Sequence, residues 1–404
     1  MNILLLDVDG VLVDDRGYRA GVTATINLCS RRMGQGDRAP DFAAIEVFHA
    51  HGFTNEWDIC PLAIGILITA ALKANPGLAL SVSPLDDFLA QFRSVTVGPV
   101  DYREWIVATD DWPGRPAERA MRALAHVLSD LPLSDSTRAG LAAAFSKLLS
   151  DPYDFANSPV TQLFQEHVLG STLFEEVYRM RPRFDVRSLL FDEDRAALSA
   201  SGRATLLELM SRAGARVCVY TARPSLPPTD VLDWLGNADR APIGYPPEAE
   251  LALRLVDLPD VPLVAMGRMQ WLARRVGSKV EYLTKPAPVQ SLAAILSAVS
   301  CRESESLESA YRLVSEGESA QLLSPLMGRP LDVWVVEDAT PGLHAAAGAV
   351  DLLRKHGVDA RLRAIGVSSG GPKAEALAGS CEVIAPTVDE AIAYIADHIW
   401  TSQP

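Results

Sequence analysis

Short runs of mainly apolar residues recur along the chain. The first covers residues 3–6 and is followed by Asp7, Asp9 and Gly10. A run of this length without polar positions is typical of a strand that is buried on both faces of a parallel sheet. Similar runs occupy residues 216–220, 262–266, 331–336, 364–367 and 381–384.

Segments with helical periodicity separate most of the later runs. They include residues 202–214, 288–299 and 342–356. Strands that alternate with helices in this way indicate an α/β fold, in which a parallel sheet has helices on both faces.

Residues 15–195 break this alternation, because they have helical periodicity and almost no strand signal. Pro and Gly residues divide the stretch into the amphipathic segments 38–51, 61–74, 84–92, 116–131 and 135–149. We therefore predict an inserted, mainly α-helical domain at 15–195, and an α/β core formed by residues 1–14 and 196–404. Within the core, the Ser-rich segment 301–324 is expected to be a polar excursion.

The composition is that of a globular protein with a sizeable core, since 48% of the 404 residues are hydrophobic. A formal net charge of −14 provides no positive field that would attract nucleic acid or an anionic membrane. A small phosphate ester remains a suitable ligand, because a metal ion and a few basic side chains can reverse the charge locally.

The chain contains no signal for export or for membrane insertion. Its five cysteines lie at wide spacings without a C-x-x-C pair, which favours reduced thiols over a disulfide framework or a zinc site. The apolar run at 3–6 is too short for a signal peptide. The most apolar internal stretch, 61–72, is shorter than the roughly 20 residues that cross a bilayer, so we interpret it as a buried helix. We expect a cytoplasmic protein, and a homo-oligomer is compatible with these features.

Polar residues that follow the predicted strands are the candidates for chemistry, because ligands bind at the carboxyl ends of parallel strands. The candidates for catalysis or metal binding are Asp7 and Asp9 after the first strand, Thr221 after the second, Lys285 in a later loop, and Glu337 with Asp338 after residues 331–336. The neighbouring residues that we assign to substrate binding are Gly10, Ala222 and Arg223.

Two carboxylates at positions i and i+2 can have different roles if the chain turns at Gly10. This suits Asp7 as a nucleophile that forms an aspartyl-phosphate, and Asp9 as an acid and then a base. A carboxylate that attacks an anionic phosphate needs charge neutralisation, which Mg2+ with oxygen ligands provides. The expected ligands of this Mg2+ are Asp7, the backbone carbonyl of Asp9, Asp338 and Glu337. Lys285 would offset the negative charge, and the Thr221 hydroxyl would donate to a phosphoryl oxygen.

Each of these features also has a purely structural interpretation. Asp-x-Asp-Gly after a strand is often a turn, and Thr221 can be a helix cap. Lys285 can be a solvated charge, and the acidic pair 337–338 can begin a helix. The occurrence of all four features, in order and at or near strand ends, favours the chemical interpretation of the set.

The segments DVDGVL, VYTARP, TKPAP and VVEDATPGLHAAAGA resemble the four motifs of the haloacid dehalogenase superfamily. The last of these, with RAIGVSSGG and CEVIAPTVDEAI, is similar to the branch that contains beta-phosphoglucomutase and many sugar-phosphate phosphatases. The resemblance covers the first dozen residues and about 184–395. It implies a Rossmann-like core, an aspartyl-phosphate mechanism, Mg2+ and a cap between the first two motifs. Dehalogenating members lack the second aspartate, so Asp9 favours phosphoryl chemistry.

The chain departs from this family in two respects. Position 342 is Gly where many phosphatases have a further aspartate, which implies that Glu337 shares the binding of the metal. The inserted domain, about 180 residues long, exceeds the cap that this branch usually has.

Two groups of residues in the insertion are candidates for specificity. Asn55, Trp57 and Asp58 could form a polyol-binding loop, but we favour a helix start that Thr54 or Asn55 caps, with Trp57 packed inside. The arginines that could reach a second anionic group of the substrate are Arg179, Arg181 and Arg183.

These observations predict a Mg2+-dependent phosphatase that hydrolyses a small phosphorylated metabolite, such as a sugar phosphate. A phosphomutase would use the same residues and would differ in the access of water. A catalytically idle protein that binds a phosphorylated metabolite is the third hypothesis. We expect neither nucleic acid nor a membrane as a partner.

Overall fold

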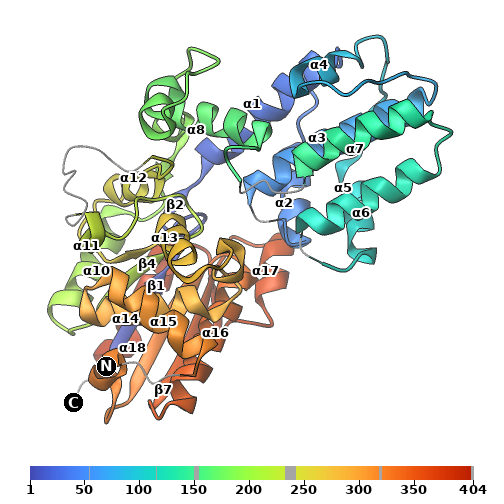
Figure 1. The fold of residues 1–404 in the computed structure, drawn as a ribbon. Helices are drawn as coiled ribbons and strands as arrows, with labels where there is room; N and C mark the ends of the chain where they lie inside the picture. Colours follow the sequence, from blue (N-terminus) through green and yellow to red (C-terminus); the bar gives the residue numbers. More distant parts are fainter. Residues whose placement is uncertain (54, 115, 150–153, 233–242, 318–320, 402–404) are drawn as a thin grey trace. The chain divides into compact units, whose positions relative to one another are not determined.

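The computed structural model describes residues 1–53, 55–114, 116–149, 154–232, 243–317 and 321–401, which form two units (Figure 1). The core unit comprises Met1–Asp15, Val177–Arg179 and Arg195–Pro404, and the helical unit comprises Arg16–Glu176 and Met180–Asp194. The chain therefore enters the helical unit after Asp15 and leaves it after Asp194, where the sequence predicts limits at 14/15 and 195/196. The role of the helical unit as a cap stays a prediction.

A six-stranded sheet in the order β5-β4-β1-β6-β7-β8 is the centre of the core unit. Its strands are β1 (Asn2–Leu6), β4 (Arg216–Tyr220), β5 (Leu263–Val264), β6 (Leu331–Glu337), β7 (Ala360–Val367) and β8 (Val383–Ala385). All neighbouring strands are parallel, so the predicted α/β class with a parallel sheet is confirmed.

Both faces of β1 are buried, which explains its unbroken apolar sequence. Ile3 and Leu5 pack into one core cluster, and Leu4 and Leu6 pack into another. The helices on the first face include α14 (Pro288–Ser300) and α16 (Thr340–Lys355), and those on the second include α10 (Ala200–Ser211) and α18 (Val388–Thr401). The other core helices are α11 (Thr229–Leu232), α12 (Glu248–Leu255), α13 (Met266–Val276), α15 (Glu303–Ser315) and α17 (Gly371–Leu377).

Two predicted elements of the core differ from the structure. The run 262–266 forms only the short strand β5, because Met266 already begins α13. The Ser-rich segment 301–324 is not a polar excursion, since most of its first half is the helix α15. Leu307, Ala310 and Leu313 are buried at three-residue spacing, so α15 packs an apolar side against α14.

A short antiparallel pair of strands joins the two places where the chain leaves and re-enters the core unit. In this pair β2 (Val13–Asp14) lies against β3 (Arg195–Ala196), with Val13 opposite Ala196. The backbone N–H groups of Ala197 and Leu198 also donate to the Leu12 carbonyl, at 2.9 and 3.2 Å. Residues 12–14, at the end of the loop that contains Asp9, are therefore hydrogen-bonded to residues 195–198, where the chain re-enters the core unit.

The helical unit contains no β-strand among its described residues. Its helices are α1 (Arg16–Arg32), α2 (Phe42–Ala50), α3 (Glu56–Ala74), α4 (Leu85–Ala90), α5 (Tyr102–Val107), α6 (Pro116–Ser129), α7 (Asp135–Leu149), most of α8 (Pro159–Tyr178), and α9 (Leu189–Glu193). The helix α3 contacts α1, α5, α6 and α7, which accounts for its apolar residues on every side.

The start of α3 agrees with the structural interpretation of the Asn55 segment. The Asn55 side chain accepts the backbone N–H of Trp57 at 2.8 Å, and the Trp57 side chain is buried. Thr54 lies outside the described residues. Among the described helices, α3 alone is long and apolar enough to cross a membrane, but 83% of its apolar window is buried inside the protein.

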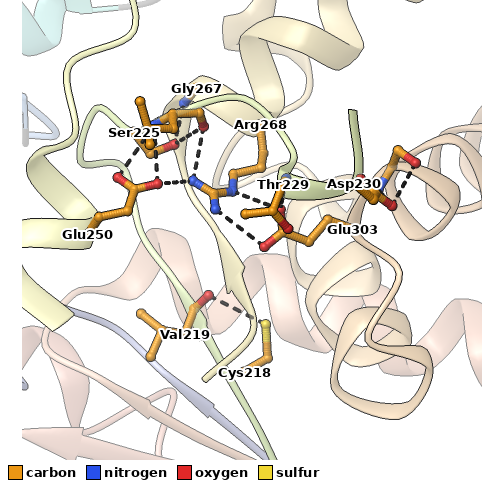
Figure 2. Close-up of polar contacts among 11 residues, drawn as sticks. Cys218, Val219, Ser225, Thr229, Asp230, Glu250, Gly267, Arg268 and Glu303 are labelled. Carbon is orange, nitrogen blue, oxygen red and sulfur yellow. Dashed lines mark hydrogen bonds and ion pairs between the residues drawn. The ribbon is translucent and has the colours of Figure 1, made fainter. Parts of the chain in front are cut away.

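A buried arginine anchors the loop that follows β4 (Figure 2). Arg268 in α13 is 2% exposed, and its guanidinium contacts the carboxylates of Glu250 and Glu303. The same guanidinium donates to the carbonyl of Leu226 at 2.9 Å, while Glu303 accepts the backbone N–H of Thr229 at 2.8 Å. Two carboxylates and one guanidinium therefore hold the loop after Arg223 against α12, α13 and α15.

We expect Arg268→Met to lower the free energy of unfolding by about 3 kcal/mol, because it leaves the buried carboxylate of Glu303 and the half-buried carboxylate of Glu250 without their common cation. Urea unfolding measures this loss. Arg275→Met on the same helix is the matched control, since the Arg275 side chain is 62% exposed and pairs with Glu308 at the surface. Such a surface pair contributes less than about 1 kcal/mol, so equal losses in the two variants would contradict the anchoring role of Arg268.

Candidate active site

The register of the sheet sets the centre of the site. Leu6 at the end of β1 pairs with Val219 of β4 and with Val336 of β6. The next residue, Asp7, donates its backbone N–H to the Val336 carbonyl at 3.1 Å. Asp7 therefore emerges between the carboxyl ends of β4 and β6, beside Glu337.

Three carboxylates meet at this point. Asp7, Glu337 and Asp338 each bring one oxygen to within 4.8 Å of the others. Burial, and then the charge of Glu337, raise the pKa of Asp7 to about 7, although Lys285 opposes this shift. Oδ1 of Asp7 is buried and accepts no hydrogen bond of good geometry from the described residues. The Lys285 ammonium nevertheless lies 3.1 Å from this oxygen and pairs with it by charge.

Lys285 supplies a buried positive charge to this cluster. Its Nζ lies 2.6 Å from Oε1 of Glu337 and 3.1 Å from Oδ1 of Asp7. It also donates to the Tyr220 carbonyl at 3.1 Å, and lies 3.8 Å from the centroid of the Tyr220 ring. Burial disfavours the ammonium form, but the carboxylates of Asp7 and Glu337 outweigh it and raise the pKa of Lys285. Lys285 is therefore an ammonium ion at neutral pH, not a solvated surface charge.

Lys373 is a second cation of the site that the sequence analysis missed. It lies in α17 and contacts Oδ2 of Asp338. Since α17 follows β7, the rule that residues after strands converge applies to Lys373 as well as to the residues chosen from sequence. With three carboxylates and these two ammonium groups ionised, the cluster has a net charge of −1.

The donor set of the cluster fits Mg2+. Asp7, Glu337 and Asp338 offer hard carboxylate oxygens, and neither His nor Cys belongs to the group. A divalent cation would also offset the charge that raises the pKa of Asp7. The predicted contribution of Asp9 is its backbone carbonyl, and its side chain is not part of this oxygen cluster.

The side chain of Asp9 is held by Arg223. Nε and Nη2 of Arg223 lie 2.7 and 2.6 Å from Oδ1 of Asp9, and the arginine is buried. Burial raises the pKa of Asp9 to about 7, although Arg223 opposes this shift. From the sequence, Arg223 is expected to bind substrate, and no sequence pattern indicates this contact between two residues that are far apart in the chain.

The other predicted residues after β4 have local roles in the structure. The buried Thr221 hydroxyl accepts the backbone N–H of Arg223 at 3.2 Å, while Ala222 is exposed.

Gly10, in the loop after β1, has a φ of +70°, and a Cβ there would lie 2.1 Å from Oδ2 of Asp338. Glycine is therefore needed at position 10 both for the turn and for the approach of Asp338.

The glycine at position 342 has a similar spatial reason. A Cβ on Gly342, in the first turn of α16, would lie 1.7 Å from Oε1 of Glu337. The carboxylate of Glu337 thus occupies the space that a side chain at 342 would need. The two positions are coupled, because Glu337 can take this place only opposite a glycine.

Comparisons with known proteins support the fold. No protein-family model matches the chain, and no curated protein matches it. An X-ray structure of a Northeast Structural Genomics Consortium target is similar with a TM-score of 0.61 and 15% identity, over 98% of this chain and 99% of that one. At this identity the likeness shows the fold alone.

Two further solved structures cover the same shares of the chains, 98% and 99%. One is a phosphatase, Tt82, from Thermococcus thioreducens, with 13% identity and a TM-score of 0.45. The other is a hydrolase from Pseudomonas syringae, with 11% identity and a TM-score of 0.35. These TM-scores are too low to support an argument about this protein.

We expect Gly342→Ala to weaken Mg2+ binding about tenfold or more, because the new Cβ displaces Glu337 from Lys285 and from the other carboxylates. Calorimetric titration with Mg2+ measures the affinity without reference to activity. Gly348→Ala, the same change in the same helix, is the control, since its Cβ would approach only Pro288, at 3.3 Å. If both variants bound Mg2+ with equal affinity, the coupling of Gly342 to Glu337 would be refuted.

Proposed function

We propose that this protein is a Mg2+-dependent phosphohydrolase of the haloacid dehalogenase kind, and that it hydrolyses a small phosphate monoester. The observation that carries the proposal is the placement of Asp7 at the end of the central strand. There it has two acidic neighbours within 4.8 Å, a buried lysine at 3.1 Å and a second aspartate two residues on. A turn that only ends a strand does not require this set of buried charges.

In the proposed reaction, an oxygen of the Asp7 carboxylate attacks phosphorus, and the bond from phosphorus to the ester oxygen breaks. Asp9 gives a proton to the departing alcohol and then takes one from a water molecule, whose oxygen attacks the same phosphorus. The second step releases inorganic phosphate and restores the Asp7 carboxylate. A pKa of about 7 for Asp9 suits both transfers at neutral pH.

Lys285 and Lys373 have an electrostatic role in this proposal. Lys285 holds Asp7 and Glu337 by ion pairs, and Lys373 holds Asp338. Asp7, Glu337 and Asp338 would hold the Mg2+, together with the Asp9 carbonyl. When bound, the ion neutralises charge on the transferred phosphoryl group.

A phosphatase and a phosphomutase would use the same residues, with Asp9 held by Arg223 in either case. Both residues belong to the core unit, so the acid and base is held in place by that unit's own residues. We infer that it can activate water whenever a phosphoenzyme is present. A phosphomutase would have to keep water from this base until its second substrate arrived.

Asp7→Asn should abolish phosphate release, because the amide resembles the carboxylate in shape but is a poor nucleophile. The test is a screen of phosphorylated metabolites for Mg2+-dependent release of phosphate by the wild-type protein and the variant. Product analysis separates hydrolysis from transfer of the phosphoryl group within the substrate. Asp332→Asn, at the amino end of β6, is the control and should retain activity. Full activity of Asp7→Asn would exclude Asp7 as the nucleophile.

Phosphate release should stop when EDTA removes divalent ions and should return with Mg2+. The oxygen donors of Asp7, Glu337 and Asp338 would also bind Ca2+, but its longer and looser coordination misplaces the nucleophile, so we expect little activity. Elemental analysis confirms that the metal has been removed. Undiminished turnover in the metal-free protein would disprove the metal requirement.

A further inference from the structure

Gln290 is a fully buried polar residue, 0% exposed, on the helix that follows Lys285. Its Nε2 donates to the carbonyl of Thr221 at 2.8 Å and to the carbonyl of Val264 at 3.2 Å. Its Oε1 accepts the backbone N–H of Lys285 at 3.2 Å. One side chain thus contacts the ends of β4 and β5 and the loop that carries the lysine.

The partners determine the orientation of the Gln290 amide. The two carbonyl oxygens can only accept hydrogen bonds, and the Lys285 backbone N–H can only donate one. The NH2 group must therefore face the carbonyls, and the oxygen must face Lys285. A reversed amide would place like groups together at all three contacts.

These contacts fix the backbone on both sides of the Lys285 ammonium. On one side, Gln290 holds the Lys285 backbone itself. On the other, it holds the Thr221 carbonyl, one residue after Tyr220, whose carbonyl accepts a hydrogen bond from Lys285 Nζ. The same Nζ makes the ion pairs with Asp7 and Glu337.

We propose that Gln290 is a positioning residue, which sets the place of the Lys285 ammonium between Asp7 and Glu337. It touches neither of these carboxylates, so it acts through the lysine and the end of β4. Only the kinetic test of this inference rests on the proposed function. The hydrogen bond to the Lys285 backbone can be tested without it.

Two buried serines on the same helix show that a polar side chain there need not make such contacts. The hydroxyls of Ser291 and Ser297 have no hydrogen-bond partner among the described residues. Ser291 is adjacent to Gln290 in the chain, which makes Ser291→Ala a matched control for a polar change in α14. We expect that control to keep the kinetic constants of the wild-type protein.

Gln290→Leu and Gln290→Glu should each lower kcat about 10- to 100-fold, because small misplacements of charged groups have effects of this size. Leu removes all three hydrogen bonds. Glu keeps the length of the side chain but turns an oxygen toward the two carbonyls. Since Gln290 is sealed from solvent, KM for the substrate should change less than about threefold. A role in folding alone would lower the melting temperature without lowering kcat per folded molecule.

Amide hydrogen exchange gives a readout that needs no substrate. Pro286 and Pro288 have no amide hydrogen, so a peptide over residues 283–288 reports on few sites, Lys285 among them. The Lys285 amide should exchange faster in Gln290→Leu than in the wild-type protein or in Ser291→Ala. If Gln290→Leu does not fold, kcat of Gln290→Glu decides the question.

The outcomes separate this inference from the proposed function. If the wild-type protein hydrolyses a phosphate ester and both Gln290 variants keep the kcat of Ser291→Ala, the positioning role is overturned and the phosphohydrolase stands. If no phosphate ester is hydrolysed, the proposed function fails. The exchange rate of the Lys285 amide is then the test of the positioning role of Gln290. Unchanged exchange in Gln290→Leu would then overturn the inference.

Discussion

Negative charge buried at the end of the central strand is the constraint on which the rest of the core unit depends. Carboxylates that leave water lose solvation that other charges or hydrogen bonds must replace. Lys285 meets this need for Asp7 and Glu337, and Lys373 does so for Asp338. The lysine is in turn surrounded by oxygen atoms, including the Tyr220 carbonyl. Each member of the cluster is therefore stable only in the presence of the others.

Two glycines leave room for the carboxylates of the cluster. Oδ2 of Asp338 lies where a Cβ of residue 10 would be, and Oε1 of Glu337 lies where a Cβ of residue 342 would be. The acidic pair at the end of β6 therefore needs a glycine at position 10, in the loop after β1, and another at position 342, in α16. This explains why Gly342 and Glu337 occur together: a side chain at 342 would exclude the present position of Glu337.

The sequence predicted what depends on local pattern. β4 begins and ends at the predicted residues, and Asp7, Lys285, Glu337 and Asp338 come together as expected. The composition of residues 301–324 was misleading because α15 buries polar residues as well as apolar ones: Ser306 is 0% exposed, and Glu303 is buried against Arg268. The contacts of Lys373 with Asp338 and of Arg223 with Asp9 join residues far apart in the chain, and only the packed structure determines such pairs.

Asp7 and Asp9 show how one loop can place two carboxyl groups in different surroundings. Asp7 is buried and Asp9 is half-buried, and the loss of surrounding water raises the pKa of each to about 7. Their partners differ, since Asp7 faces a lysine and two acids, whereas Oδ1 of Asp9 accepts a hydrogen bond from Nε of Arg223 and lies 2.6 Å from its Nη2. A divalent ion at the first site would favour the ionised form of Asp7, which a nucleophile requires. For Asp9, burial is the largest cause of the raised pKa; the charges of Asp15 and Asp7 add to it, and Arg223 opposes it. The turn after β1, with Gly10 at a φ of +70°, thus places two carboxyl groups only two residues apart in different electrostatic surroundings, as the proposed roles of nucleophile and proton carrier require.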